Sequence, residues 1–349
     1  QPNWNFKYEL DKDLLGSGWE YSSESCTFLP ADVNIFLAET KSRPVHDLPL
    51  GVQYLKPRTT GAKVGFVARC CTENGREYLG YFDDPMEAHY KYKETKEAYG
   101  RRLAEKYKDQ IDQKAFDALQ DAEISTDTFS FYTSVSSVYS SKIEGEDIEL
   151  DSYIKHKKFG IEFLPDYTKK IDDLYNAYTF AKSNEINEKN IAEAHKLLSK
   201  HIVAKNRQGK LRTQNMYVST PDGRIEYVAA SPFEVETEMK KFYADLSILL
   251  KTEMNIEEVF FYASLIHLVF VKIHPWNDGN GRSARLYEKW FLAQKLGEKA
   301  WFVQSEKMYY NRHQTYYSNI RLLGLEYPEL DYNQALPFLL MLPNAVVNE

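Results

Sequence analysis

The chain has 349 residues and a formal net charge of −7, and 43% of its residues are hydrophobic and 14% aromatic. This length predicts two domains, because a single hydrophobic core rarely grows beyond about 250–300 residues. The aromatic content argues against a disordered chain, and the acidic balance argues against a protein whose main task is to coat nucleic acid.

The cysteines and the start of the chain bear on its compartment. Cys26, Cys70 and Cys71 are too few for a disulfide framework and lack metal-ligand spacing. The chain starts at Gln1, so we expect a processed protein or a fragment. It shows no signal peptide and no apolar run long enough to span a bilayer. We therefore expect a cytoplasmic protein without membrane association.

Residues 1–122 are expected to form a separate α+β module. Asn74-Gly75 is a strong signal for a two-residue hairpin turn, because both central positions of that turn need positive φ. Pro85 suits the first position of a helix that runs from Met86 to about Lys108. The three strands of the expected antiparallel sheet cover residues 51–56, 64–71 and 76–82.

The remainder of the chain is predicted to be mainly α-helical. Residues 123–154 are expected to hold a linker and one helix, and residues 155–349 a helical catalytic domain. The expected helices cover residues 132–142, 165–182, 188–198, 232–250, 255–273 and 281–296, with a last pair past Gln304.

One segment interrupts this helical pattern. Two short alternating runs between Asn215 and Val228 flank Pro221-Asp222-Gly223, whose residues favour a turn. The segment predicts a β-hairpin inside an otherwise helical domain.

The stretch from His274 to Arg285 (HPWNDGNGRSAR) combines an imidazole, a carboxylate, a glycine-rich turn and two arginines. The helix before it should end at His274, because Pro275 disfavours a helical residue before it. The next helix starts near Gly281, where free N–H groups and the helix dipole favour an anion. Arginines in that first turn work against the dipole, which indicates that an anion belongs there.

This stretch resembles the signature of the Fic family, His-x-Phe-x-Asp/Glu-Gly-Asn-Gly-Arg-x-x-Arg, with Trp276 in place of the phenylalanine. The resemblance implies an all-helical Fic core and a protein adenylyltransferase, which moves AMP from ATP to a Ser, Thr or Tyr hydroxyl of a target protein. It implies that His274 is the catalytic base and that Asp278 binds Mg²⁺. The residues implied to bind the ATP phosphates are Gly279, Asn280, Gly281, Arg282 for the β-phosphate and Arg285 for the γ-phosphate.

A second motif precedes the helical domain. Alone, Gly145 is a helix-stop residue and Glu144 a surface carboxylate. Beside the signature, Ser140 to Gly145 resembles the inhibitory Ser/Thr-x-x-x-Glu-Gly/Asn motif of Fic proteins. The resemblance implies that Glu144 takes the place of the γ-phosphate on Arg285, since an arginine fork suits a carboxylate and a phosphate equally well.

The family resemblance also makes the predicted hairpin a flap that holds the target protein by strand addition; a plain structural hairpin is the alternative. The flap residues are Met216, Tyr217, Val218, Tyr227 and Val228. Contacts to adenine and ribose are expected from Tyr309, Tyr310, Asn311, Tyr316 and Tyr317, although an aromatic stripe also fits a core. His267 is expected to be a core histidine, and no role is expected for His195, His201 or His313.

Residues of about 8–120 resemble the ethylene-response-factor-like domain of phage HNH homing endonucleases, but the chain holds no HNH nuclease motif. That resemblance places six sheet residues toward DNA: Tyr54, Lys56, Arg58, Lys63, Arg69 and Arg76. Residues 1–122 carry 17 Lys and Arg against 20 Asp and Glu. We expect at most weak DNA binding, because phosphate neutralisation supplies most non-specific affinity.

Two alternatives stay open at this point. A Fic protein with this signature could use another phosphate donor or remove AMP, or the chain could be a DNA-tethered regulator with a silent Fic domain. The target protein, the trigger that displaces Glu144 and the formation of a homo-oligomer are also left open by the sequence.

Overall fold

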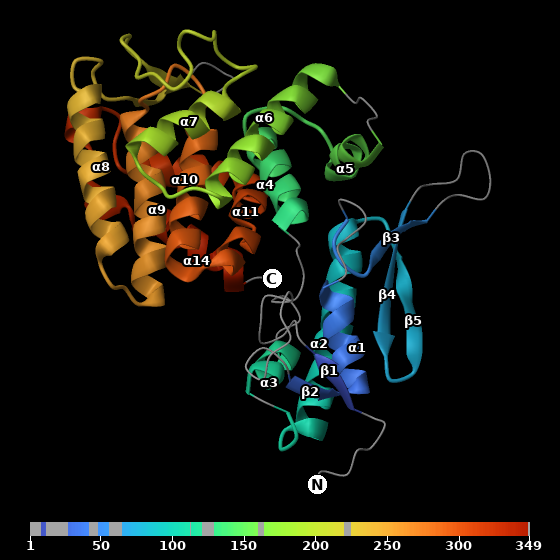
Figure 1. Cartoon of the computed structure of the whole chain (residues 1–349). Helices are drawn as coiled ribbons and strands as arrows, with labels where there is room; N and C mark the ends of the chain where they lie inside the picture. The colour runs from blue at the N-terminus through green and yellow to red at the C-terminus, as the bar shows by residue number, and fades with distance from the viewer. Residues whose placement is uncertain are drawn as a thin grey trace. The chain divides into compact units, whose positions relative to one another are not determined.

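The structure is a computed structural model (Figure 1) that describes residues 8–11, 27–41, 48–55, 65–111, 113–120, 129–159, 164–219 and 225–347. The chain divides into two compact units, Gln1–Phe131 and Tyr132–Glu349. The fold is mainly α-helical with small antiparallel sheets, as the sequence predicts.

Unit 1 contains a three-stranded antiparallel sheet with the order β3-β4-β5. Its strands are β3 (Val52–Leu55), β4 (Gly65–Thr72) and β5 (Gly75–Phe82). The turn between β4 and β5 contains Asn74, and Thr72 pairs with Gly75 across it. Helix α2 (Pro85–Tyr107) packs against the sheet, and the Asp84 side chain caps it by accepting from the Met86 N–H at 2.5 Å. The predicted three strands and helix are therefore present.

Unit 1 also holds elements that the sequence does not predict. They are β1 (Tyr8–Asp11), β2 (Thr27–Pro30), α1 (Ala31–Lys41) and α3 (Gln113–Gln120). Strands β1 and β2 pair across a long connection, so no short turn marks them. Leu29, Phe36, Tyr99 and Leu119 belong to one buried cluster, which joins β2 and α1 to α2 and α3.

Unit 2 is a bundle of helices with one hairpin. Its first helix, α4 (Phe129–Ile143), starts three residues before the boundary between the units. The elements that follow are α5 (Leu150–Phe159), α6 (Pro165–Lys182), α7 (Glu188–Leu198), β6 (Tyr217–Ser219), β7 (Ile225–Val228), α8 (Val235–Lys251), α9 (Ile256–Ile273), α10 (Asn280–Leu296), η1 (Glu298–Phe302), α11 (Ser305–Asn311), α12 (His313–Arg321), η2 (Tyr327–Glu329), η3 (Tyr332–Gln334), α13 (Leu336–Leu339) and α14 (Met341–Val347). The pair expected past Gln304 is four short helices instead, because turns and 3₁₀ segments divide that region. Helix α5 was also not predicted.

Helices α9 and α10 form the centre of unit 2 (Figure 1). Helix α9 starts with a capping box between Asn255 and Glu258, which satisfies free N–H groups at its start. Helix α10 packs against α6, α7, α8 and α9, and nearly all of its side chains up to Leu292 are buried. The loop that connects α9 to α10 carries the signature residues.

Strands β6 and β7 form the predicted hairpin, with Tyr217 opposite Val228 and Val218 opposite Tyr227. The turn predicted at residues 221–223 lies outside the described residues. The Val228 N–H donates to the Leu325 carbonyl at 2.8 Å, so β7 is also tied to the segment that follows α12.

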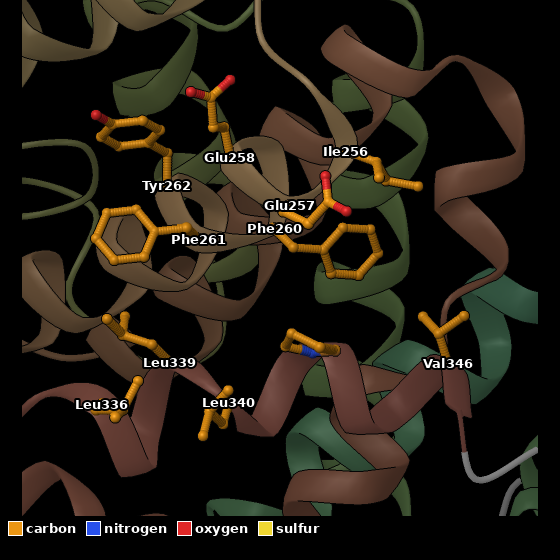
Figure 2. Close-up of a pocket in the computed structure, with 11 residues that line it drawn as sticks. Ile256, Glu257, Glu258, Phe260, Phe261, Tyr262, Leu336, Leu339, Leu340 and Val346 are labelled. Atoms are coloured by element: carbon orange, nitrogen blue, oxygen red, sulfur yellow. The ribbon is translucent and has the colours of Figure 1, made fainter.

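An apolar pocket of about 670 Å³ lies at the start of α9, beside α13 and α14 (Figure 2). The residues that line it include Phe260, Leu336, Leu340 and Glu257. Helix α9 has 18 residues, so its two ends lie roughly 27 Å apart. The pocket is therefore remote from the signature loop, which follows the other end of the helix. None of the described helices is both long and apolar enough to cross a membrane.

Candidate active site

His274 ends α9 in the left-handed conformation, with φ +52°. Its Nδ1 lies 3.2 Å from the Val271 carbonyl. Because a carbonyl only accepts, this contact assigns the ring proton to Nδ1 and leaves the Nε2 lone pair free to take a proton. Burial lowers the pKa of His274 to about 4, and the charge of Arg212 acts in the same direction. The imidazole is therefore a neutral base at pH 7.

Arg212 holds the backbone of this loop in place. Its guanidinium is 2% exposed and donates to four backbone carbonyls: those of His274 at 2.6 Å, Gln214 at 2.6 Å, Ala230 at 2.5 Å and Ile273 at 3.2 Å. Gln214 and Ala230 lie at the two ends of the flap hairpin. Arg212 therefore ties the flap to His274, and its charge complements the negative end of the α9 dipole.

A second set of contacts shapes the loop after His274. The Asn280 amide accepts from the Trp276 N–H at 2.8 Å and donates to the Trp276 carbonyl at 2.9 Å. Trp276 stacks on His195, with ring centroids 4.4 Å apart. His195 accepts from the Gly209 N–H through Nδ1 at 2.9 Å, so its Nε2–H donates to the Asp278 carbonyl at 3.0 Å. His195, for which no role was expected, thus supports the loop.

The start of α10 has space for an anion. A Cβ on Gly281 would lie 2.4 Å from the Glu144 Oε1 atom, so the missing side chain is what lets a carboxylate approach the helix. The Asn280 side-chain amide bonds to the Trp276 backbone and closes the loop. The N–H groups of the first turn, at Asn280, Gly281 and Arg282, have no partner within the helix and remain as donors for an anion.

Asp278 is exposed, and one of its carboxylate oxygens accepts from the Gly279 N–H at 2.6 Å. No group of three or more His, Cys, Asp or Glu residues that could hold a metal occurs in the described parts of the chain. A single carboxylate suits Mg²⁺ that takes its other ligands from phosphates and water, and the role of Asp278 in holding Mg²⁺ stays a prediction.

Arg285 is 1% exposed and all three of its nitrogens have partners. Its Nη2 donates to Glu144 Oε1 at 2.5 Å and to the Ser140 carbonyl at 3.0 Å. Its Nε donates to Ser140 Oγ at 2.8 Å, and Nη1 to the Tyr316 hydroxyl at 3.4 Å. Burial acts to raise the pKa of Glu144, but the charges of Arg285 and Arg282 outweigh it and lower that pKa, so the carboxylate is ionised.

The end of α4 places Glu144 in this position. Gly145 has φ +94°, a conformation that favours glycine, and it turns the chain directly after Glu144. The N–H groups of Glu144 and Glu146 both donate to the Ser141 carbonyl, at 3.0 and 3.1 Å. This turn directs two carboxylates, those of Glu144 and Glu146, toward α10.

Arg282 also has a carboxylate partner. Its Nη2 donates to Glu146 Oε1 at 3.1 Å, and both side chains are about 4% exposed. Lys170 of α6 donates to the same oxygen at 3.2 Å. Both arginines of the signature therefore contact the segment that follows α4.

The structure corrects two of the predicted adenine contacts. Tyr309 and Tyr316 are buried, and both pack around His267, which has no exposed surface. Tyr309 donates to Glu288 at 2.8 Å, and the Tyr316 hydroxyl lies 2.9 Å from His267 Nε2. The Tyr309 hydroxyl serves the core, and the Tyr316 hydroxyl contacts both His267 and Arg285. A stripe at helical spacing does not reveal which face meets a ligand. Tyr310 and Tyr317 are partly exposed and Asn311 is exposed.

The five flap residues differ in exposure. Tyr217 is exposed, and Met216, Val218 and Val228 are partly exposed. Tyr227 is buried, and its hydroxyl lies 3.2 Å from His274 Nδ1. Tyr227 therefore contacts the candidate base rather than the surface, where a target protein would bind.

The sheet residues predicted to face DNA are only partly described. Arg69 and Arg76 are exposed, and the Tyr54 ring packs against Phe66 at 5.2 Å between centroids. Lys56, Arg58 and Lys63 lie outside the described residues.

Comparison with known proteins agrees with this site. Residues 185–292, which include the whole signature, match the Fic/DOC family. This part of the chain is therefore similar to a Fic domain. The motif from Ser140 to Gly145 lies before the matched residues. The resemblance of residues 8–120 to homing endonucleases finds no support in these matches and stays a prediction.

The chain is 32% identical over 111 residues to a protein named protein adenylyltransferase Fic from Nematostella vectensis, and this match covers 32% of the chain. It spans about a quarter (24%) of that relative's length. The fold is similar to a Fic family protein from Desulfovibrio desulfuricans (TM-score 0.51, 19% identity, 61% of this chain and 62% of that one). It is also similar to a Fic domain containing signaling protein from Bacteroides thetaiotaomicron (TM-score 0.50, 18% identity, 62% of this chain and 83% of that one).

Sequence reasoning missed several residues that shape this site, namely Arg212, His195, Glu146 and Lys170. Each acts through a contact between segments far apart in the chain, so no local spacing marks it. Only Glu146 had a signal, since it is a second acidic residue two positions after Glu144.

We expect Arg212→Met to lower the free energy of unfolding by at least about 3 kcal/mol. Four carbonyls lose their donor, and each unsatisfied buried acceptor costs about 1–3 kcal/mol. Urea unfolding followed by circular dichroism measures this. Arg212→Lys, which keeps the charge and part of the donor capacity, should lose less. A loss below about 1 kcal/mol in the Met variant would contradict the role given to Arg212.

Proposed function

We propose that the protein is an adenylyltransferase that transfers AMP from ATP to a hydroxyl of a target protein and is inhibited by its own Glu144. The main support is one arrangement: the Glu144 carboxylate lies over Gly281 and bonds to Arg285 at the start of α10. An internal anion thus occupies a site suited to phosphate. The name of the Nematostella vectensis relative agrees with this proposal.

In the proposed reaction, His274 Nε2 takes the proton from the target hydroxyl. The hydroxyl oxygen then forms a bond to the α-phosphorus, the bond from that phosphorus to the bridging oxygen breaks, and pyrophosphate leaves. A neutral, buried imidazole suits this step because it accepts a proton without first losing one. The rigid loop around His274 supplies the orientation.

The chain offers donors for each phosphate. The N–H groups at the start of α10 would bind the α-phosphate, Arg282 would bind the β-phosphate, and Arg285 would bind the γ-phosphate once Glu144 leaves. Asp278 would hold Mg²⁺, which neutralises phosphate charge when bound.

The target protein would bind along the flap. Strand addition to the β6–β7 hairpin supplies main-chain hydrogen bonds without demanding a particular sequence. Because Arg212 bonds to both ends of the hairpin and to His274, a target held there would be placed at a fixed distance from the base.

A second candidate function is removal of AMP from a modified protein. The Glu144 carboxylate lies against Gly281, at the end of the loop that His274 begins. A carboxylate near the base could position water for attack on the phosphorus. The presence of His274, Asp278 and Arg285 together argues against a silent domain that only tethers a regulator to DNA.

We expect Glu144→Gly to raise AMP transfer about ten- to a hundredfold. A charge-assisted hydrogen bond contributes about 1.5–3 kcal/mol, which corresponds to that range. Adding Arg285→Ala should remove the gain, since both changes act on one ion pair and their effects are not additive. Transfer of label from α-labelled ATP with Mg²⁺ to proteins of a cell lysate measures this.

The matched control is Glu149→Gly, which removes an exposed carboxylate of the same segment and should leave transfer unchanged. Unchanged transfer and ATP affinity in the Glu144→Gly protein would refute inhibition by Glu144. Loss of label from a modified protein, in place of gain, would favour AMP removal.

The lowered pKa of His274 predicts a flat pH profile. With a pKa of about 4, the base stays neutral between about pH 5.5 and 8, and the transfer rate of the Glu144→Gly protein should change less than about twofold. The charge of Glu144 raises the pKa of His274, so the Glu144→Gly change should lower that pKa further and keep the profile flat. For a histidine with the ordinary pKa of about 6.5, the neutral fraction would fall about tenfold between about pH 8 and pH 5.5.

Labelling rates measured at saturating ATP across this range test the profile. His274→Ala, which keeps the phosphate contacts, should bind ATP but transfer no AMP. A tenfold decline toward pH 5.5, or near-native labelling by His274→Ala, would show that this histidine is not the neutral base described here.

A further inference from the structure

The two arginines of the signature, Arg282 and Arg285, differ in how many of their guanidinium nitrogens have a hydrogen-bond partner. Arg285 uses every guanidinium nitrogen on Glu144, Ser140 and Tyr316. Arg282 uses Nη2 on Glu146, while Nε and Nη1 have no hydrogen-bond partner in the described part of the chain. A buried guanidinium with two unpaired nitrogens lacks hydrogen-bond acceptors, because buried donors are nearly always paired.

The Glu146 carboxylate is held through one oxygen, since Oε2 has no hydrogen-bond partner among the residues that the structure describes. The Glu146 side chain is about 4% exposed, and Oε1 accepts from both Arg282 and Lys170. Lys170 belongs to α6, so the carboxylate is fixed from a helix outside the segment that carries Glu144. This cation also offsets the negative charge of Glu146 beside the phosphate site.

We propose that Glu146 is a positioning residue that orients Arg282 for the β-phosphate of the nucleotide. This inference rests on the proposed function. Glu146 holds one edge of the guanidinium and leaves Nε and Nη1 for the ligand, whereas Glu144 occupies the edge of Arg285 that the ligand needs. Glu144 and Glu146, on either side of Gly145, therefore have opposite effects on nucleotide binding: Glu144 blocks it and Glu146 supports it.

The alternative is that Glu146 competes with phosphate as Glu144 does. The geometry disfavours competition, because the contact with Glu146 takes only one of the three nitrogens of Arg282. Because Glu146 already orders the Arg282 side chain, that side chain loses less conformational entropy when a ligand binds.

The test is binding of AMP and ADP, measured by titration calorimetry. It compares the Glu144→Gly protein with Glu144→Gly/Glu146→Gln, so that Glu144 does not interfere. We expect the second change to weaken ADP binding about tenfold and to leave AMP binding within about twofold, because AMP has no β-phosphate. Glu146→Asp, whose shorter carboxylate reaches less far, should cause an intermediate loss and serves if the Gln variant does not fold. Glu149→Gln is the matched control and should change neither affinity.

Unchanged or tighter ADP binding in the Glu146→Gln variant would overturn the positioning role. Equal weakening of AMP and ADP would also overturn it, since that indicates general damage at the start of α10. If the Glu144→Gly parent bound no ADP at all, the proposed function would fail and this inference with it.

Discussion

Helix α10 buries four ionisable side chains, and the structure of unit 2 depends on the partner that each one has. Lys289 donates to Glu306 at 2.6 Å, and Glu288 pairs with His267 at 2.7 Å. Arg285 pairs with Glu144, and Arg282 pairs with Glu146. A buried charge without a partner is strongly destabilising. The central helix can therefore keep its place only while α9, α11 and the segment after α4 supply these partners.

The four pairs differ in whether a ligand could take the place of the partner. Glu288 and Lys289 lie deep in the bundle, with partners that have no exposed surface. Arg282 and Arg285 lie in the first two turns of α10, where the helix dipole also favours an anion. In the proposed function a phosphate takes the place of Glu144 on Arg285 and keeps the charge balance, while Glu146 stays on Arg282. Under this proposal, the same requirement that stabilises the fold would provide a ligand site and a means of blocking it.

Much of this arrangement could be predicted from local pattern, and the remainder depends on contacts between distant segments. Helical spacing predicted α6, α7, α9 and α10, and residue types predicted the loop around His274. The short helix α5 and the pairing of β1 with β2 have no comparable signal. Tyr309 and Tyr316 were wrongly assigned to adenine because spacing does not distinguish a core face from a ligand face. Arg212 and His195 were missed because their partners are backbone groups of other segments, which a sequence pattern does not reveal.

The position of the ATP phosphates in a crystal structure of the Glu144→Gly protein with ATP and Mg²⁺ tests the central claim most directly. The account predicts the γ-phosphate within about 3 Å of the Arg285 guanidinium, where the Glu144 carboxylate lies in the native chain. It also predicts that the α-phosphorus faces His274 Nε2. Phosphates bound elsewhere at saturating ATP, with the start of α10 free of ligand, would contradict it.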